Sequence, residues 1–248
     1  MAAWLNSTFY SFDHAVLAFL HEIAEHAGGV LTPVMKLATL LQEKALLMIL
    51  AALVLMLFAR KRRTGVCMFG AIACATIITS IVLKDLVGRL RPFEASEVYR
   101  SWWLAVGAPP EEGFSFPSGH VTGAVAALTA LCLFEGRRWV APSLLWVFLV
   151  GVSRNYLMAH YPSDVLFGAL AGLVSAGIAY AITRLIFRIL EDHEDVPFFA
   201  FLLDYDLPLR RGGVPSAPAP AAENHASHGH EGKTVSPQQG YVGKHLKK

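Results

Sequence analysis

Residues 64–92 read TGVCMFGAIACATIITSIVLKDLVGRLRP, and this stretch decides the class of fold. Its first twenty residues carry no charge, which is about the length that an α-helix needs to cross the hydrocarbon core of a bilayer. The end of the stretch then gathers four charged side chains, Lys84, Asp85, Arg89 and Arg91. Ionisable residues next to a membrane span are costly, so this cluster predicts a functional site at one end of a membrane helix.

The rest of the chain is similarly apolar, because hydrophobic residues make up 54% of its 248 residues. We predict an all-α fold: an integral-membrane six-helix bundle whose successive spans alternate in direction. A first span begins near Phe12 and continues past Pro33, the alternative being an amphipathic helix on the membrane surface. The other spans are expected at about 44–60, 64–84, 115–134, 139–156 and 162–186.

The C-terminal part differs in composition. From about residue 212, Pro, Ala, Ser, Gly and His dominate without an apolar period, and such a segment cannot bury enough surface to fold. We therefore predict a transmembrane domain over residues 1–195 and a C-terminal segment over 196–248 that is disordered from about residue 212.

Charge predicts the orientation. Basic residues cluster at 60–63, at 137–138 and after the last span, and the positive-inside rule places this side in the cytoplasm. We expect a multi-pass protein of a bacterial plasma membrane with a cytoplasmic C-terminus. A net charge of only +2 predicts no nucleic-acid partner, and the three cysteines match no metal spacing. The sequence carries no signal for an oligomeric state.

Three short motifs hold the chemistry: KDLVGRLRP at 84–92, PSGH at 117–120 and SRNYLMAHYPSD at 153–164. They follow the third span, open the fourth span, and join the fifth span to the sixth. In an alternating bundle all three therefore lie on one face, opposite the basic residues 60–63. We expect this extracytoplasmic face to hold the site.

The first motif supplies cations. Lys84 and Arg91 are seven residues apart, about two helical turns, so they can share a helix face and clamp phosphate oxygens. The alternative is a pair of basic residues that contact lipid headgroups. Asp85 and Arg89, four residues apart, are interpreted as a surface ion pair.

The other two motifs add an anion site and two imidazoles. Ser118 is placed to cap the following helix, Gly119 lets an anion approach the backbone, and His120 falls in the first turn. Arg154 can bind phosphate. His160 and Asp164 are four residues apart, so the carboxylate can reach a ring nitrogen, although a purely structural pair has the same spacing.

Together these residues resemble the type 2 phosphatidic acid phosphatase family, whose pattern is K-x6-RP, PSGH and SR-x5-H-x3-D. The chain matches every position of that pattern, and the helix pattern extends the likeness to about residues 12–190. The resemblance implies a membrane phosphatase that needs no metal and no cofactor. It implies that His160 is the nucleophile, that Asp164 orients it and that His120 is the acid and base. It assigns phosphate binding to Lys84, Arg91, Ser118, Gly119 and Arg154.

The expected partners are a lipid phosphate and the bilayer. We favour hydrolysis of undecaprenyl diphosphate to undecaprenyl phosphate; phosphatidylglycerol phosphate, phosphatidate and lipid A phosphates are alternatives, since no residue selects among them. A lipid-to-lipid phosphotransferase would share the phosphoenzyme. A transporter or flippase would instead place its charges near the middle of the bilayer.

Overall fold

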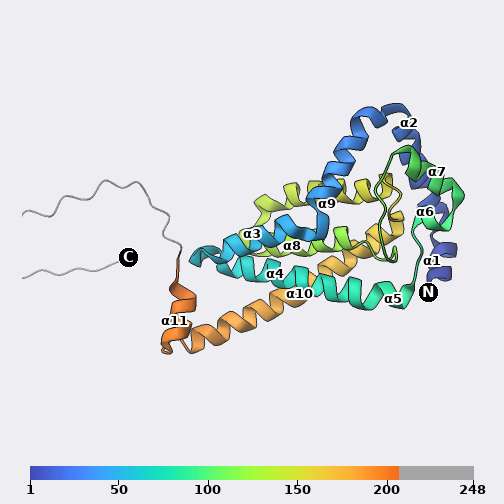
Figure 1. The fold of residues 1–248 in the computed structure, drawn as a ribbon. Helices are drawn as coiled ribbons and strands as arrows, with labels where there is room; N and C mark the ends of the chain where they lie inside the picture. Colours follow the sequence, from blue (N-terminus) through green and yellow to red (C-terminus); the bar gives the residue numbers. More distant parts are fainter. Residues whose placement is uncertain (207–248) are drawn as a thin grey trace, which may run out of the picture. The chain divides into compact units, whose positions relative to one another are not determined.

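A computed structural model describes residues 1–206, which contain helices and no strand, so the predicted all-α fold is confirmed (Figure 1). Its α-helices are α1 (Ala2–Thr8), α2 (Tyr10–Leu41), α3 (Leu46–Met56), α4 (Arg62–Thr76), α5 (Lys84–Val87), α6 (Pro92–Ala95), α7 (Glu97–Ala105), α8 (Gly119–Glu135), α9 (Val140–Tyr156), α10 (Pro162–Asp192) and α11 (Pro197–Asp204). Short 3-10 turns are η1 (Glu43–Ala45), η2 (Ala59–Lys61) and η4 (Arg137–Trp139), and η3 (Ile77–Leu83) is a π-helix. The predicted disorder from residue 212 lies outside the described residues.

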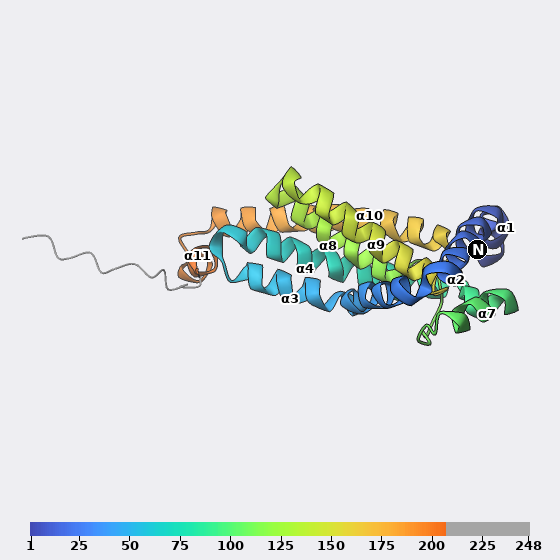
Figure 2. The same cartoon turned by 90° about the horizontal axis from the view of Figure 1, so that it is seen from above.

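The centre of the bundle is a close packing of α4, α8 and α10, with α3 against α4 and α2 against α9 (Figures 1 and 2). Small residues make this packing possible. A Cβ added at Gly172 of α10 would lie 2.7 Å from the carbonyl oxygen of Thr122 in α8, and one at Gly168 would lie 2.9 Å from that of Ser118. Glycines spaced four apart let two helix backbones approach closely, as is common between membrane helices.

The predicted spans correspond to helices, with one difference in direction. Residues 64–84, 115–134, 139–156 and 162–186 fall on α4 with η3, on α8, on α9 and on α10. The first segment is the single helix α2, which runs through Pro33. However, α3 follows α2 with a bend of only 40° at η1, so these two helices do not reverse direction as expected. The N-terminus therefore lies at the same end of the bundle as α5 and α7 (Figures 1 and 2).

Length and apolar composition single out membrane spans independently. The segment Ala59–Ala95, which is helical up to Val87, and helix α10 are each long and apolar enough to cross a bilayer. The bent pair α2–α3 is long and apolar enough when it is taken as one unit. Helix α8 is apolar but shorter, and the glycine contacts hold it against α10. Ionisable residues beside membrane spans are costly, so the polar residues gathered at one end of these apolar helices mark a candidate functional site.

The opposite end of the bundle holds the basic residues of the α3–α4 turn. There the Arg62 guanidinium donates to the backbone carbonyls of Leu202 (2.6 Å) and Leu203 (2.9 Å) at the end of α11. Helix α11 thus contacts the start of α4, although it lies beyond the predicted domain boundary at residue 195. That boundary stays a prediction.

Candidate active site

The three motifs meet at one end of the bundle, as the spacing predicted. Lys84 begins α5, Gly119 and His120 begin α8, and Arg154 lies in the last turn of α9. His160 lies in the short connection between α9 and α10. Electrostatic coupling joins them, because the charges of Arg154, Arg91 and Lys84 all act on His120. Pro92 disfavours a helical conformation at the residue before it, and Arg91 is extended. Helix α5 already ends at Val87, and Gly88 has a φ of 63°, so Lys84 and Arg91 do not share a helix face.

His160 is completely buried and has a defined tautomer. Its Nδ1 lies 2.7 Å from the backbone carbonyl oxygen of Ser115, which can only accept a hydrogen bond, so Nδ1 carries the proton. Its Nε2 is then unprotonated and lies 3.5 Å from Nη1 of Arg91. Burial lowers the pKa of His160 well below its usual value, and the nearby Arg154 and Arg91 lower it further. This nitrogen therefore has a free lone pair in a neutral ring and lies next to a cation.

Asp164 contacts His160 less directly than predicted. Its Oδ2 is 3.9 Å from Nδ1 of His160, which is close enough for an ion pair but too long for a hydrogen bond. Oδ2 instead accepts hydrogen bonds from the Ser115 hydroxyl (2.6 Å) and from the backbone N–H of Tyr161 (3.0 Å). Ser115 thus binds both His160 and Asp164, and the role of Asp164 in orienting His160 stays a prediction.

Two buried arginines supply the anion-binding groups. Arg91 is held by the backbone carbonyls of Gly113 (2.9 Å) and Ala159 (3.0 Å). Both arginines also pair with the carboxylate of Glu111: Arg91 Nη1 lies 2.9 Å from its Oε2, and Arg154 Nη2 contacts its Oε1. These contacts show that the guanidinium groups of two separate motifs face one anion-sized position.

Several buried polar atoms around this position have no hydrogen-bond partner within the described part of the chain. They include Ser118 Oγ, His120 Nε2 and Arg154 Nε. Ser118 is at the N-cap position of α8, as expected, but its hydroxyl makes no cap bond. A Cβ added at Gly119 would meet no atom within 4 Å, so the backbone there is open. Buried polar groups are normally paired, so unpaired ones that converge indicate a site for a polar ligand.

Arg89 forms a second buried network, which corrects the interpreted surface pair with Asp85. Its side chain is 1% exposed and donates to Asp164 Oδ1 (2.6 Å), Asp13 Oδ2 (2.8 Å) and Asn6 Oδ1 (2.8 Å). Asp13 of α2 also accepts from the backbone N–H of Ser163 (2.8 Å), and so caps the start of α10. The network therefore ties α2 and the first motif to Asp164.

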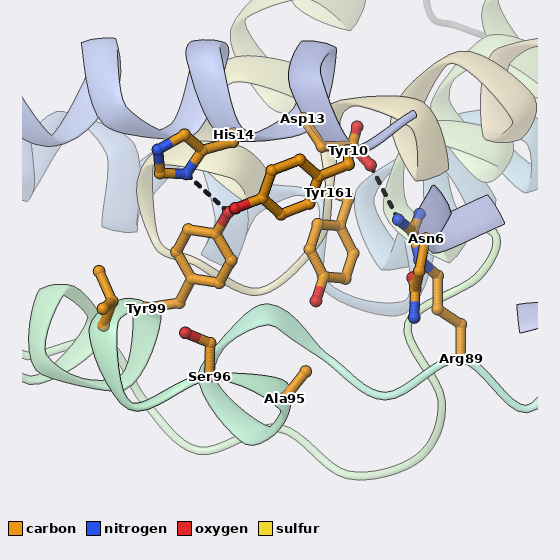
Figure 3. A pocket seen from close by; sticks show the side chains of 10 residues that line it. Asn6, Tyr10, Asp13, His14, Arg89, Ala95, Ser96, Tyr99 and Tyr161 are labelled. Carbon is orange, nitrogen blue, oxygen red and sulfur yellow. Dashed lines mark hydrogen bonds and ion pairs between the residues drawn. The ribbon is translucent and has the colours of Figure 1, made fainter. Parts of the chain in front are cut away.

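A cavity of about 280 Å³ lies beside this network (Figure 3). Its lining includes Tyr10, Tyr99 and Tyr161, and the ring of Tyr161 stacks over the Arg89 guanidinium with 3.8 Å between Cζ and the ring centroid. His14 and the Tyr99 hydroxyl are 3.0 Å apart on the same wall (Figure 3). Arg89 thus has the cavity on one side and Asp164 on the other.

Sequence reasoning missed Asp13, Arg89, Glu111 and Ser115. For Arg89 and Asp13 a signal was present, because a charged residue within or beside an apolar helix indicates a functional or paired group. Glu111 and Ser115 lie in an irregular loop, where no periodicity marks them. Among residues 1–206, no three His, Cys, Asp or Glu side chains lie close enough together to hold a metal ion. The absence of a metal or cofactor requirement stays a prediction.

Known proteins resemble this chain over the same region. It is 33% identical to a lipid A 4'-phosphatase of Bacteroides thetaiotaomicron over 46% of the chain, and the match spans only 52% of that relative's length. It is 29% identical to undecaprenyl-diphosphatase BcrC of Bacillus subtilis, over 68% of the chain and 82% of BcrC. The crystal structure of LpxE from Aquifex aeolicus superposes with a TM-score of 0.55 at 26% identity, covering 66% of this chain and 93% of LpxE.

The family profile described as the PAP2 superfamily matches residues 64–188. This matched segment is half of the chain and contains all three motifs, together with α8, α9 and most of α4 and α10. The family resemblance read from the motifs is therefore confirmed: the chain belongs to the PAP2 superfamily.

Proposed function

We propose that this protein is a membrane phosphatase that hydrolyses the phosphate of a lipid. One observation carries the proposal: His160 presents an unprotonated Nε2 next to the guanidinium group of Arg91, and Arg91 shares the carboxylate of Glu111 with Arg154 in the same buried site. Cations that face a developing negative charge are the main catalytic need of phosphoryl transfer. The similar proteins that are named phosphatases of lipid A or undecaprenyl diphosphate support the same class of reaction.

The first step is attack by His160 on phosphorus. The Nε2 lone pair forms an N–P bond while the bond from phosphorus to the leaving oxygen breaks. His120 donates a proton from its Nε2, which has no other partner in the described structure, to that oxygen. The negative charge of the bound phosphate offsets the cations around His120 and so supports the protonated ring that this step needs. In the second step His120 takes a proton from water, the water oxygen attacks phosphorus, and the N–P bond breaks to release inorganic phosphate.

The remaining site residues hold the phosphate. Arg91, Arg154 and Lys84 spread their positive charge over its oxygens, while Ser118 and the backbone N–H of Gly119 donate from the start of α8. Asp164 stabilises the positive charge that His160 gains during attack. This division of roles rests on the family resemblance together with the placement of the residues.

For the substrate we propose undecaprenyl diphosphate. Two relatives with prenyl groups in their names match over most of their length: the undecaprenyl-diphosphatase BcrC over 82%, and a decaprenylphosphoryl-5-phosphoribose phosphatase of Mycolicibacterium smegmatis over 81% at 32% identity. The match to the lipid A 4'-phosphatase covers 52% of that protein. The charged residues lie at helix ends, which favours an enzyme over a transporter.

We further propose that the site faces the extracytoplasmic side of a bacterial plasma membrane and that the C-terminus is cytoplasmic. The basic α3–α4 turn at the opposite end supports this orientation. An undecaprenyl chain would then stay in the bilayer while its diphosphate enters the cationic site.

The test is phosphate release by the purified protein in detergent with EDTA present. We expect release from undecaprenyl diphosphate, with slower release from phosphatidate and phosphatidylglycerol phosphate. His160→Ala should lower kcat by a factor on the order of 10⁴ or more and abolish the phosphoenzyme. His193→Ala, which removes an exposed histidine at the far end of α10, is the matched control. An absolute requirement for Mg²⁺, or full turnover by His160→Ala, would refute the mechanism.

A further inference from the structure

Glu111 occupies the place where the proposed substrate must bind. Its carboxylate joins Arg91 and Arg154, whose side chains are only 3% and 0% exposed. Its own side chain is 20% exposed, so it closes the cationic site from the outer side. Although burial alone would raise the pKa of Glu111, the charge and hydrogen bond of Arg154 lower that pKa to about 2. The carboxylate is therefore ionised throughout the physiological pH range.

A carboxylate and a phosphate present similar pairs of oxygens to a guanidinium group. They cannot both occupy the two arginines, because the like charges would repel in a site of low dielectric constant. Without an anion, the two buried guanidinium groups would repel each other instead. The site thus needs one anion at a time, and in the free protein Glu111 supplies it.

The loop that carries Glu111 is free of helix and is flanked by glycines. Residues 106–118 contain no helix, and Gly107 (φ 57°) and Gly113 (φ 74°) flank Glu111 in the left-handed region. A cavity of about 380 Å³ is lined by Gly107 and Pro109 of this loop and by Thr39 of α2. Glycines on either side and open space nearby are features of loops that change position when a ligand binds.

We propose that Glu111 is a specificity-determining residue, an internal competitor that a terminal phosphate displaces and a phosphodiester cannot. A terminal phosphate or diphosphate carries more than one negative charge at neutral pH and outcompetes a single carboxylate. A phosphodiester headgroup carries one charge and does not. A cationic site at the surface of a bilayer rich in phosphodiester lipids would otherwise be filled by them. This inference deepens the proposed function and rests on it for the identity of the substrate.

The decisive variant is Glu111→Gln, which keeps the shape of the side chain and removes its charge. We expect the Kd of inorganic phosphate to fall by about tenfold, because the competing anion no longer occupies the site. We also expect phosphatidylglycerol in mixed micelles to become a competitive inhibitor of lipid phosphate hydrolysis by Glu111→Gln. In micelles without phosphatidylglycerol, the variant should have a lower KM for the substrate than the wild type. Glu112→Gln is the matched control, since Glu112 is exposed and contributes only its backbone carbonyl to Arg91.

The measurement of phosphate binding tests this inference separately from the proposed function, because the affinity for inorganic phosphate is measured without turnover. If the wild-type protein does not hydrolyse lipid phosphates but Glu111→Gln binds inorganic phosphate more tightly, the proposed function is refuted and the role of Glu111 as an internal competitor is retained. Unchanged or weaker phosphate binding, or equal exclusion of phosphatidylglycerol by wild type and Glu111→Gln, would overturn the inference. Should Glu111→Gln fail to fold, Glu111→Asp is the second variant. It keeps the charge on a shorter side chain that reaches the two arginines less well, so we expect phosphate affinity to rise, but by less than in Glu111→Gln.

Discussion

At the scale of single residues, the protonation of His160 follows from one contact. The carbonyl of Ser115 fixes the proton on Nδ1 and leaves Nε2 free, whereas the carboxylate of Asp164 lies too far away to do so directly. A backbone carbonyl cannot change its charge, so this tautomer is independent of pH while His160 is neutral. The tautomer of His160, the proposed nucleophile, is thus set by Ser115 and not by Asp164.

The pH dependence of catalysis should reflect this environment. Because burial and the nearby arginines lower the pKa of His160, the imidazole stays neutral as the pH falls through 6.5, where an exposed histidine would gain a proton. We expect kcat/KM to show no loss attributable to His160 between pH 7.5 and about 6.5, and its acid limb to lie below that range. A pH–rate profile of the purified protein checks this. An acid limb of kcat/KM with its half-maximal value at pH 6.5 or above would contradict the prediction.

Arg89 should matter for stability far more than its neighbour Asp85. Arg89→Ala would leave Asp13 and Asp164 buried without their cation, which we expect to lower the free energy of unfolding by about 3–5 kcal/mol. Asp85→Ala removes an exposed charge of the same motif and should change it by less than about 0.5 kcal/mol. Unfolding in detergent measures both, and equal effects of the two substitutions would show that the buried network is not stabilising.

At the scale of elements, the distance between α8 and α10 sets the geometry of the site. The backbone N–H of Ser118 donates to the carbonyl of Asp164 (3.1 Å), so the start of one helix is fixed against the start of the other. Gly168 and Gly172 allow this approach, because a side chain at either position would meet the backbone of α8. The position of the start of α8, where we propose that phosphate binds, therefore depends on two glycines of α10.

Two glycines of α10 provide a matched test of this packing. Gly172→Ala would place a methyl group 2.7 Å from the Thr122 carbonyl oxygen, and we expect a loss of about 1–3 kcal/mol in stability together with reduced kcat/KM. Gly177→Ala, where nothing lies within 4 Å, should be neutral or stabilise the helix by up to about 1 kcal/mol. Thermal unfolding and activity distinguish them; full activity and stability in Gly172→Ala would show that the helices separate without consequence.

At the scale of the whole chain, the direction of each helix decides which residues meet. Because α2 and α3 continue in one general direction, the N-terminus and Asp13 lie at the end that holds the three motifs (Figure 1). With the expected reversal between these helices, Asp13 would lie at the opposite end and could not contact Arg89. The bend at η1 is therefore what brings α1 and the start of α2 to the site.

This arrangement predicts the accessibility of introduced cysteines. In a variant whose three native cysteines are replaced by alanine, Ser101→Cys on α7 should react with a membrane-impermeant maleimide added to sealed cells. Arg138→Cys, at the opposite end, should react only after permeabilisation; both positions are exposed in the structure. The reverse pattern would invert the orientation proposed from the positive-inside rule.

The sequence by itself determined the helical class, the approximate limits of most helices and the meeting of the three motifs at one end. These features depend on apolar length and on alternation of direction across the bundle, which are local and repetitive properties. Spacing alone was wrong about the exposure of Arg89 and about a shared helix face of Lys84 and Arg91. The Asp164 carboxylate does lie within ion-pair distance of His160, but spacing did not show that Ser115 contacts both residues.

Only the tertiary structure decided how the charges are paired. Asp13 and Ser163 are 150 residues apart in the chain, and Arg154 and Glu111 are separated by 43, so no local spacing could reveal these contacts. A buried charge takes whichever partner the packing of the helices brings within reach, because leaving it unpaired in a low dielectric is costly. Membrane helices can thus be predicted from composition. The pairing of charged residues at one end of the bundle depends instead on the bend at η1 and on the glycine contacts between α8 and α10.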